Sequence, residues 1–210
     1  MKKICSIDIE TYADMDMVKF LPPVTADTRL KDEAKIQADI EKKKQDQIEK
    51  MPLNPLFSKI ACIGYYSEDK KEVDMTDEET ALKNFFRFLK NYVDIGEVKL
   101  VSWNGNGFDF PFIFKRGMRY GLCKLQDVEK YISKNNPYHV DLMFLWAGYG
   151  KFEKLDTVSS VLIHDCKESF DVQDIGKCLE TEEGQFLLHK YCLTDCELTY
   201  KLGEMFIHAW

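Results

Sequence analysis

The sequence lacks any apolar run near the roughly 18 residues that a membrane-spanning helix requires. Its first residues, MKKICSIDIETY, reach Asp8 and Glu10 before an apolar stretch of signal-peptide length develops. It also lacks internal repeats and low-complexity tracts. These absences argue against a membrane-spanning or exported protein. We therefore expect a cytoplasmic protein with no membrane partner.

No C-x-x-C pair occurs among the seven cysteines, which are Cys5, Cys62, Cys123, Cys166, Cys178, Cys192 and Cys196. The odd count, and the placement of several in apolar stretches, favour reduced core thiols over a disulfide framework or a zinc ribbon. His189, Cys192 and Cys196 have a spacing that superficially suits a metal. No fourth ligand is evident, and a helical cysteine is most often a small buried side chain, so we expect no zinc.

Basic residues are not in excess, since 29 Lys and Arg face 36 Asp and Glu for a net charge of −7. This balance argues against a protein that coats nucleic acid by bulk charge. It is compatible with an enzyme that holds a short segment and uses carboxylates for its metals. Lysines 42–44 have Glu41, Asp46 and Glu49 around them, which is typical of a solvated helix face.

Strand and helix patterns alternate along the 210 residues. The expected strands cover residues 3–9, 59–66, 72–75 and 99–103, and residues 138–145 form a short strand or an extended segment. The expected helices cover residues 28–51, 76–95, 154–162 and about 183–207, and another begins near Asp109. The pattern predicts an α/β layer fold with a mixed sheet, in which a hairpin over 59–75 supplies antiparallel strands.

We expect one domain over residues 1–210, with a charged helical insertion at about 28–51. Prolines at 22, 23, 52 and 55 bracket this insertion. Thr76 and Glu79 fit a capping box at the start of the next helix.

Carboxylates stand at three places where the surrounding sequence is apolar. Asp8 and Glu10 share one face of an expected central strand, Asp109 lies between two phenylalanines, and Asp195 follows Tyr191 by one helical turn. Taken singly, a strand end, a helix N-cap and a solvated helix residue explain them equally well. Taken together, four converging carboxylates suit a pair of hard divalent cations that cleave a phosphodiester.

Three segments then carry a resemblance: SIDIET at 6–11, NGNGFD at 104–109 and YCLTD at 191–195. Their patterns, D-x-E, N-x-x-x-F-D and Y-x-x-x-D, resemble the three exonuclease motifs of the DEDD superfamily. The nearest likeness is to the proofreading exonuclease of family B DNA polymerases and its stand-alone bacterial and phage relatives. The motifs occur in the family's order and span nearly the whole chain.

The resemblance implies a ribonuclease H-like fold, with a mixed β-sheet flanked by α-helices. It also implies metal-dependent 3′-5′ exonuclease activity on DNA, at single-stranded or frayed 3′ ends. Asp8, Glu10, Asp109 and Asp195 would be catalytic and would ligate two divalent ions, Mg²⁺ or Mn²⁺. Tyr191 would orient the attacking water.

The spacing and chemistry of Tyr191 agree with the role that the resemblance assigns to it. Tyr191 lies one turn before Asp195 on the same helical face. A tyrosine hydroxyl, with an ordinary pKa near 10, is a poor base at neutral pH, so we assign Tyr191 water positioning. In the other branch of the superfamily a histidine precedes the last aspartate by five residues, and here that position is Lys190.

Expected substrate contacts come from the same motifs. By resemblance Thr11 and Asn104 lie near the 3′-terminal nucleotide. Asn104 is equally explained as a turn residue with an unusual backbone conformation beside Gly105. Phe108 either stacks on a base or, the better interpretation, belongs to the core. Asp141 either organises the site or ends a strand.

Two rival functions share these motifs. An RNA-trimming 3′-5′ exoribonuclease would use the same carboxylates, because the motifs do not read the 2′-hydroxyl. A catalytically silent exonuclease fold would serve as a binding module, although four carboxylates argue against it. Met1 lies close to the first motif and no polymerase follows the last one, so we expect a stand-alone protein. Such a protein would proofread for a separate polymerase or replication protein, or act in DNA repair.

Overall fold

The computed structural model describes residues 3–133, 136–148, 150–166 and 175–208. The chain divides into two compact units, one formed by residues 1–10 and 60–210 and the other by residues 11–59. The expected insertion at 28–51 falls inside the second unit. Its extent as an insertion in a single domain stays a prediction.

Five strands form one sheet in the order β3-β2-β1-β4-β5. They are β1 (Lys3–Ala13), β2 (Ser58–Tyr66), β3 (Lys71–Asp74), β4 (Val98–Ser102) and β5 (His139–Asp141). Strands β1, β4 and β5 are parallel, with Cys5 opposite Leu100 and Leu100 opposite His139. Strands β2 and β3 form the expected antiparallel hairpin. The mixed sheet with β1 at its centre is therefore confirmed.

Helices connect and cover the strands. They are α1 (Glu33–Lys50), α2 (Glu78–Phe88), α3 (Asp109–Arg119), α4 (Leu125–Ile132), α5 (Leu142–Ala147), α6 (Leu155–Leu162), α7 (Ile175–Cys178) and α8 (Glu182–His208). Short 3₁₀ turns cover Met15–Phe20 and Met51–Leu53, and a π-helical turn covers Leu89–Val93. In the described part of the chain, no helix is long and apolar enough to cross a bilayer.

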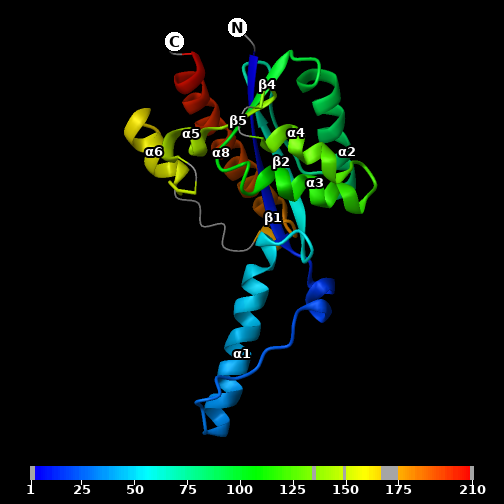
Figure 1. Cartoon of the computed structure of the whole chain (residues 1–210), viewed down its shortest axis with the longest axis vertical. Helices are drawn as coiled ribbons and strands as arrows, with labels where there is room; N and C mark the ends of the chain where they lie inside the picture. The colour runs from blue at the N-terminus through cyan, green and yellow to red at the C-terminus, as the bar shows by residue number, and fades with distance from the viewer. Residues whose placement is uncertain (1–2, 134–135, 149, 167–174, 209–210) are drawn as a thin grey trace. The chain divides into compact units, whose positions relative to one another are not determined.

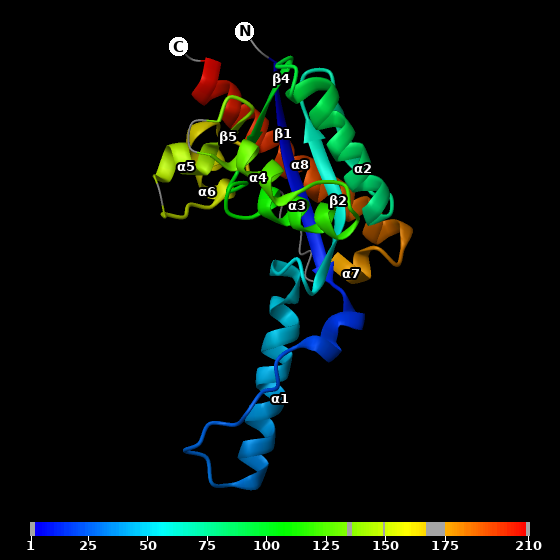
Figure 2. The same ribbon diagram turned by 45° about the vertical axis from the view of Figure 1, so that its right-hand side comes forward.

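Each face of the sheet has its own apolar core, because side chains alternate along β1. Cys5, Ile7 and Ile9 pack with residues of α2, α3 and α4. Ile4, on the opposite face, packs with residues of α5, α6 and α8. The two groups of helices lie on opposite sides of the strands (Figures 1 and 2). The sheet is thus flanked by helices, as expected.

Several predicted boundaries were wrong for local reasons. The helix expected from Thr76 is capped by Asp77, whose carboxylate accepts the N–H of Thr80, while the Thr76 hydroxyl bonds Asp74. Asp109 is the first helical residue of α3, and Phe108 occupies the cap position. Residues 138–145 combine the three-residue strand β5 with the start of α5.

The second unit contains α1, which has no buried side chain. Two of its lysines pair with acids of the same helix, which is typical of a solvated face: Lys43 with Asp39 at 2.7 Å and Lys44 with Glu41 at 3.8 Å. The ends of the unit meet, because the Asp14 N–H donates to the Phe57 carbonyl at 2.9 Å.

Candidate metal-binding active site

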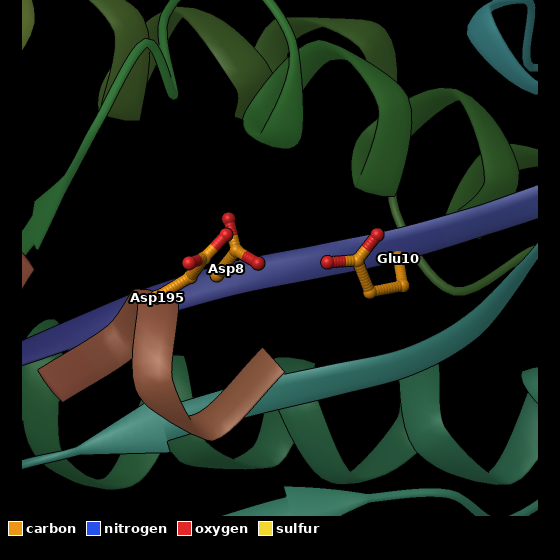
Figure 3. A group of neighbouring side chains, drawn as sticks. All are labelled: Asp8, Glu10 and Asp195. Atoms are coloured by element: carbon orange, nitrogen blue, oxygen red, sulfur yellow. The ribbon is translucent and has the colours of Figure 1, made fainter. Parts of the chain in front are cut away.

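Three carboxylates from two distant parts of the sequence converge. Asp8 and Glu10 project from β1 and Asp195 from α8, and one oxygen of each lies within 4.8 Å of the others. Figure 3 shows the three carboxyl groups along one side of β1, with that of Asp195 beside that of Asp8. Asp195 is buried, and Asp8 and Glu10 are half-buried. No other such group of three potential metal ligands occurs in the residues that the structure describes.

The sheet explains why these groups meet. Ser6, Asp8 and Glu10 alternate onto the face of β1 that α8 covers. The Ser6 hydroxyl donates to the Cys196 carbonyl at 2.6 Å and so fastens α8 to the strand. Because Cys196 follows Asp195 directly, this bond fixes the height of Asp195 along β1.

Asp109 reaches the same strand from α3 and stands outside the group of three. Its Oδ1 accepts the Ile9 N–H at 3.2 Å, between the two acidic positions of β1. Complete burial raises the pKa of Asp109 to about 7; backbone hydrogen bonds oppose this, and the charges of Asp141 and Asp195 add to it. A nearby cation would favour the ionised form of this carboxyl group.

The remaining predicted catalytic residue, Tyr191, is half-buried on α8. It lies four residues before Asp195 and therefore on the same side of the helix. Tyr191 thus shares the side of α8 that carries Asp195, and its role stays a prediction.

The turn that leads into Asp109 is held by Asp141. Both oxygens of this buried carboxylate accept backbone N–H groups, from Asn104 at 3.1 Å, Asn106 at 3.0 Å and Phe144 at 3.1 Å. Asp141 therefore ends β5, caps α5 and organises the turn at once. Asn104 has a φ of 66°, which bears out its interpretation as a turn residue in the left-handed conformation.

A second buried network supports this turn and was missed from the sequence. The His139 Nδ1–H donates to the Tyr131 carbonyl at 2.9 Å, which leaves Nε2 to accept from the Ser102 hydroxyl at 2.7 Å. The Ser102 oxygen in turn accepts the Gly105 N–H at 3.1 Å. Burial lowers the pKa of His139 to about 3, so the ring is neutral. No local spacing signals this network, because its members come from three separate elements.

The two other predicted substrate contacts have internal partners. The Thr11 hydroxyl donates to the Pro52 carbonyl at 2.8 Å, within the second compact unit. Phe108 packs against the apolar core, and the centroids of its ring and that of Phe112 are 5.3 Å apart. This agrees with the prediction that Phe108 belongs to the core. Contact of either residue with a substrate stays a prediction.

The chemistry of the converging groups fits a hard cation. Asp8, Glu10 and Asp195 offer only carboxylate oxygens, which Mg²⁺ and Mn²⁺ prefer to nitrogen or sulfur. The cysteines expected to be core thiols are free, and Cys5, Cys62, Cys192 and Cys196 are buried. Burial raises the pKa of Cys5 and Cys196 to about 12, so these thiols stay protonated.

A family of predicted 3′-5′ exonucleases related to the exonuclease domain of PolB matches residues 56–207. The chain belongs to this exonuclease family. The matched region contains Asp109, Tyr191 and Asp195, while Asp8 and Glu10 precede it. Membership implies a nucleic acid substrate and the use of metal.

Archaeal DNA polymerases are distant relatives of this exonuclease. The chain is 23% identical over 173 residues to a DNA polymerase of Thermococcus aggregans, covering 70% of this chain and 9% of that protein. It is 25% identical over 147 residues to a DNA polymerase of Pyrococcus horikoshii, covering 63% of this chain and 12% of that protein. The chain therefore spans only a small part of the length of these relatives.

The fold also matches a solved polymerase structure. The family B DNA polymerase of Pyrobaculum calidifontis superposes with a TM-score of 0.65 at 17% identity, over 98% of this chain and 24% of that one. The exonuclease thus has the ribonuclease H-like α/β fold of the PolB exonuclease domain, as the resemblance predicted.

Proposed function

We propose that the exonuclease removes nucleotides one at a time from 3′ ends of DNA, at single-stranded or frayed termini. The observation that carries this proposal is the convergence of Asp8, Glu10 and Asp195 within 4.8 Å in a member of an exonuclease family. The similarity to DNA polymerases favours DNA over RNA.

In the proposed mechanism, Asp8, Glu10 and Asp195 hold two divalent ions, Mg²⁺ or Mn²⁺, and Asp109 completes the set. Metal ions held by these carboxylates would supply a more acidic water and positive charge near the departing 3′ oxygen. Tyr191 donates or accepts a hydrogen bond that orients the attacking water. Asn104 and Thr11 lie near the terminal nucleotide, while Phe108 belongs to the core.

The proposed setting is DNA replication or repair. The relatives are DNA polymerases, so the proposed partner is a polymerase or another replication protein. With 36 acidic and 29 basic residues, the protein would bind DNA weakly and lose affinity as salt is raised.

The deciding experiment is digestion of a 5′-labelled single-stranded DNA and its RNA counterpart, each with Mg²⁺, Mn²⁺ or EDTA. Wild type is compared with Asp8→Ala and Asp195→Ala. We expect a DNA ladder that shortens from the 3′ end and that EDTA or either substitution abolishes. Faster digestion of RNA would establish the exoribonuclease instead. Cleavage of neither polymer with any metal would overturn the catalytic proposal.

A further inference from the structure

Three buried thiols lie behind the acidic group. Cys62 is on β2, and Cys192 and Cys196 are on α8; all three side chains are fully buried. Of the three, Cys192 lies between two predicted site residues: it follows Tyr191 directly and precedes Asp195 by three residues. The segment of α8 that carries Asp195 therefore also carries two buried thiols, those of Cys192 and Cys196.

Cys192 contacts a proposed metal ligand directly. Its Sγ lies 3.9 Å from Asp8 Oδ2, within the distance of an S–H···O hydrogen bond. A carboxylate only accepts, so the thiol is the donor. The thiols of Cys62 and Cys196 interact with the same sulfur.

The main chain of β2 holds this sulfur in place. A Cβ at position 64 would lie 2.6 Å from Sγ of both Cys192 and Cys196, so the two sulfurs rest directly on the backbone of Gly64. The Cys192 thiol has no room to move toward β2.

We propose that Cys192 is a positioning residue for Asp8: its thiol donates to Asp8 Oδ2 and holds the carboxylate in the orientation that binds metal. The inference rests on the proposed function of Asp8 as a ligand. Hydrogen-bond partners of ligands commonly change metal affinity by about 10- to 100-fold. A thiol is a weak donor, so we expect an effect at the low end of that range.

The test measures Mn²⁺ binding by the electron paramagnetic resonance signal of free Mn²⁺, together with digestion of single-stranded DNA over a Mn²⁺ series. The variants are Cys192→Ala, which removes the donor, and Cys192→Ser, which restores one. Cys196→Ala is the matched control, because Cys196 has the same helix, the same burial and the same contact with Gly64. Urea unfolding of each variant supplies its stability.

We expect Cys192→Ala to bind Mn²⁺ about tenfold more weakly and to digest DNA slowly at limiting Mn²⁺, with recovery at saturating Mn²⁺. Cys192→Ser should regain most of the affinity. Cys196→Ala should lose stability and keep the wild-type affinity. Unchanged affinity in Cys192→Ala, or equal losses in both alanine variants, would overturn the inference and leave Cys192 a packing residue only.

Failure of the proposed function has a separate signature. A wild-type protein that binds Mn²⁺ and digests no DNA would remove the proposed activity. The Mn²⁺ affinities of the three variants would still decide the role of Cys192. A wild-type protein that binds no Mn²⁺ would overturn both.

Discussion

Asp141 supports the candidate site without belonging to the converging carboxylates. It satisfies three backbone N–H groups, two of them in the turn that leads to Asp109. Its Oδ atoms thus connect β5 to the second sequence motif. Because Asp141 acts by holding this turn, its loss should lower both the free energy of unfolding and the activity.

We expect Asp141→Ala to lower the free energy of unfolding by about 2 to 4 kcal/mol, because a helix cap is lost and buried N–H groups are left unpaired. Activity on single-stranded DNA should fall as the turn loosens. Asp141→Asn keeps one accepting oxygen and should lose less of both. Urea unfolding and a digestion assay check this, and a fully active, fully stable alanine variant would contradict it.

Tyr191→Phe removes only the hydroxyl from α8. We expect about a 100-fold slower single-turnover digestion, because the attacking water loses its orientation. Mn²⁺ affinity should stay at the wild-type value, since no ligand is altered. Tyr200→Phe, a half-buried tyrosine further along the same helix, is the matched control and should digest normally. An unchanged rate in Tyr191→Phe would remove its assigned role.

His139 makes stability depend on pH. Its pKa is lowered to about 3 in the folded protein, against about 6.5 in an unfolded chain, so between these values the unfolded state binds the extra proton. Stability from this group is therefore full above about pH 6.5 and falls as the pH is lowered, by up to about 1.4 kcal/mol per pH unit. Urea unfolding of wild type and His139→Gln from pH 4.5 to 7.5 should show a shallower decline in the variant. Parallel declines would mean that the ring takes up its proton as readily in the folded protein as in the unfolded chain.

At the scale of the elements, β2 and α8 pack tightly against each other at Gly64. Gly64 leaves only enough space for the sulfurs of Cys192 and Cys196. Gly64→Ala should lower the free energy of unfolding by about 1 to 3 kcal/mol through overpacking. The double variant with Cys196→Ala relieves one of the two clashes and should be less destabilised than the sum of the single changes. Additive losses in urea unfolding would show that the helix simply moves aside.

Elements with a strong apolar period could be predicted from the sequence, and short ones could not. The hairpin and α8 were expected close to their observed bounds, and β1 was expected to begin at residue 3, as it does, but to end at residue 9 instead of Ala13. Helix α4 was missed because its eight residues are ordered by contacts of Val128 and Tyr131 with the core. The start of α2 was misplaced because Asp77 competes successfully with Thr76 as the cap.

Some contacts of the candidate site could be predicted from the sequence, and others could not. Asp8, Glu10 and Asp195 could be predicted to meet because their motifs fix a strand face and a helix face. The contact between Cys192 and Asp8 joins residues 184 positions apart, and no local pattern indicates it. The triple role of Asp141 likewise depends on β5 lying beside β4, which a three-residue strand does not signal.

At the scale of the whole molecule, the second compact unit begins and ends at the same place. The Asp14 N–H meets the Phe57 carbonyl at 2.9 Å, so the two chain ends that enter this unit lie next to each other. We expect that replacing residues 15–56 by a short Asn-Gly turn leaves the first unit folded, because loop closure at this point requires few residues. Thermal melting should stay cooperative and the Mn²⁺ titration should match the full chain, while the helical circular dichroism signal should fall by the contribution of α1. Loss of the cooperative melt would show that both units fold together.

The buried thiols of Cys192 and Cys196 make the separation of α8 from β2 measurable by chemical labelling. A thiol reagent cannot reach Cys192 or Cys196 while their side chains are fully buried, and it labels them only when α8 lifts from β2. The ratio of the labelling rate in the native protein to that in an unfolded chain therefore gives the free energy of this local opening. Asp195 moves away from β1 in the same event, so the labelling rate also measures how often this proposed metal ligand is out of place.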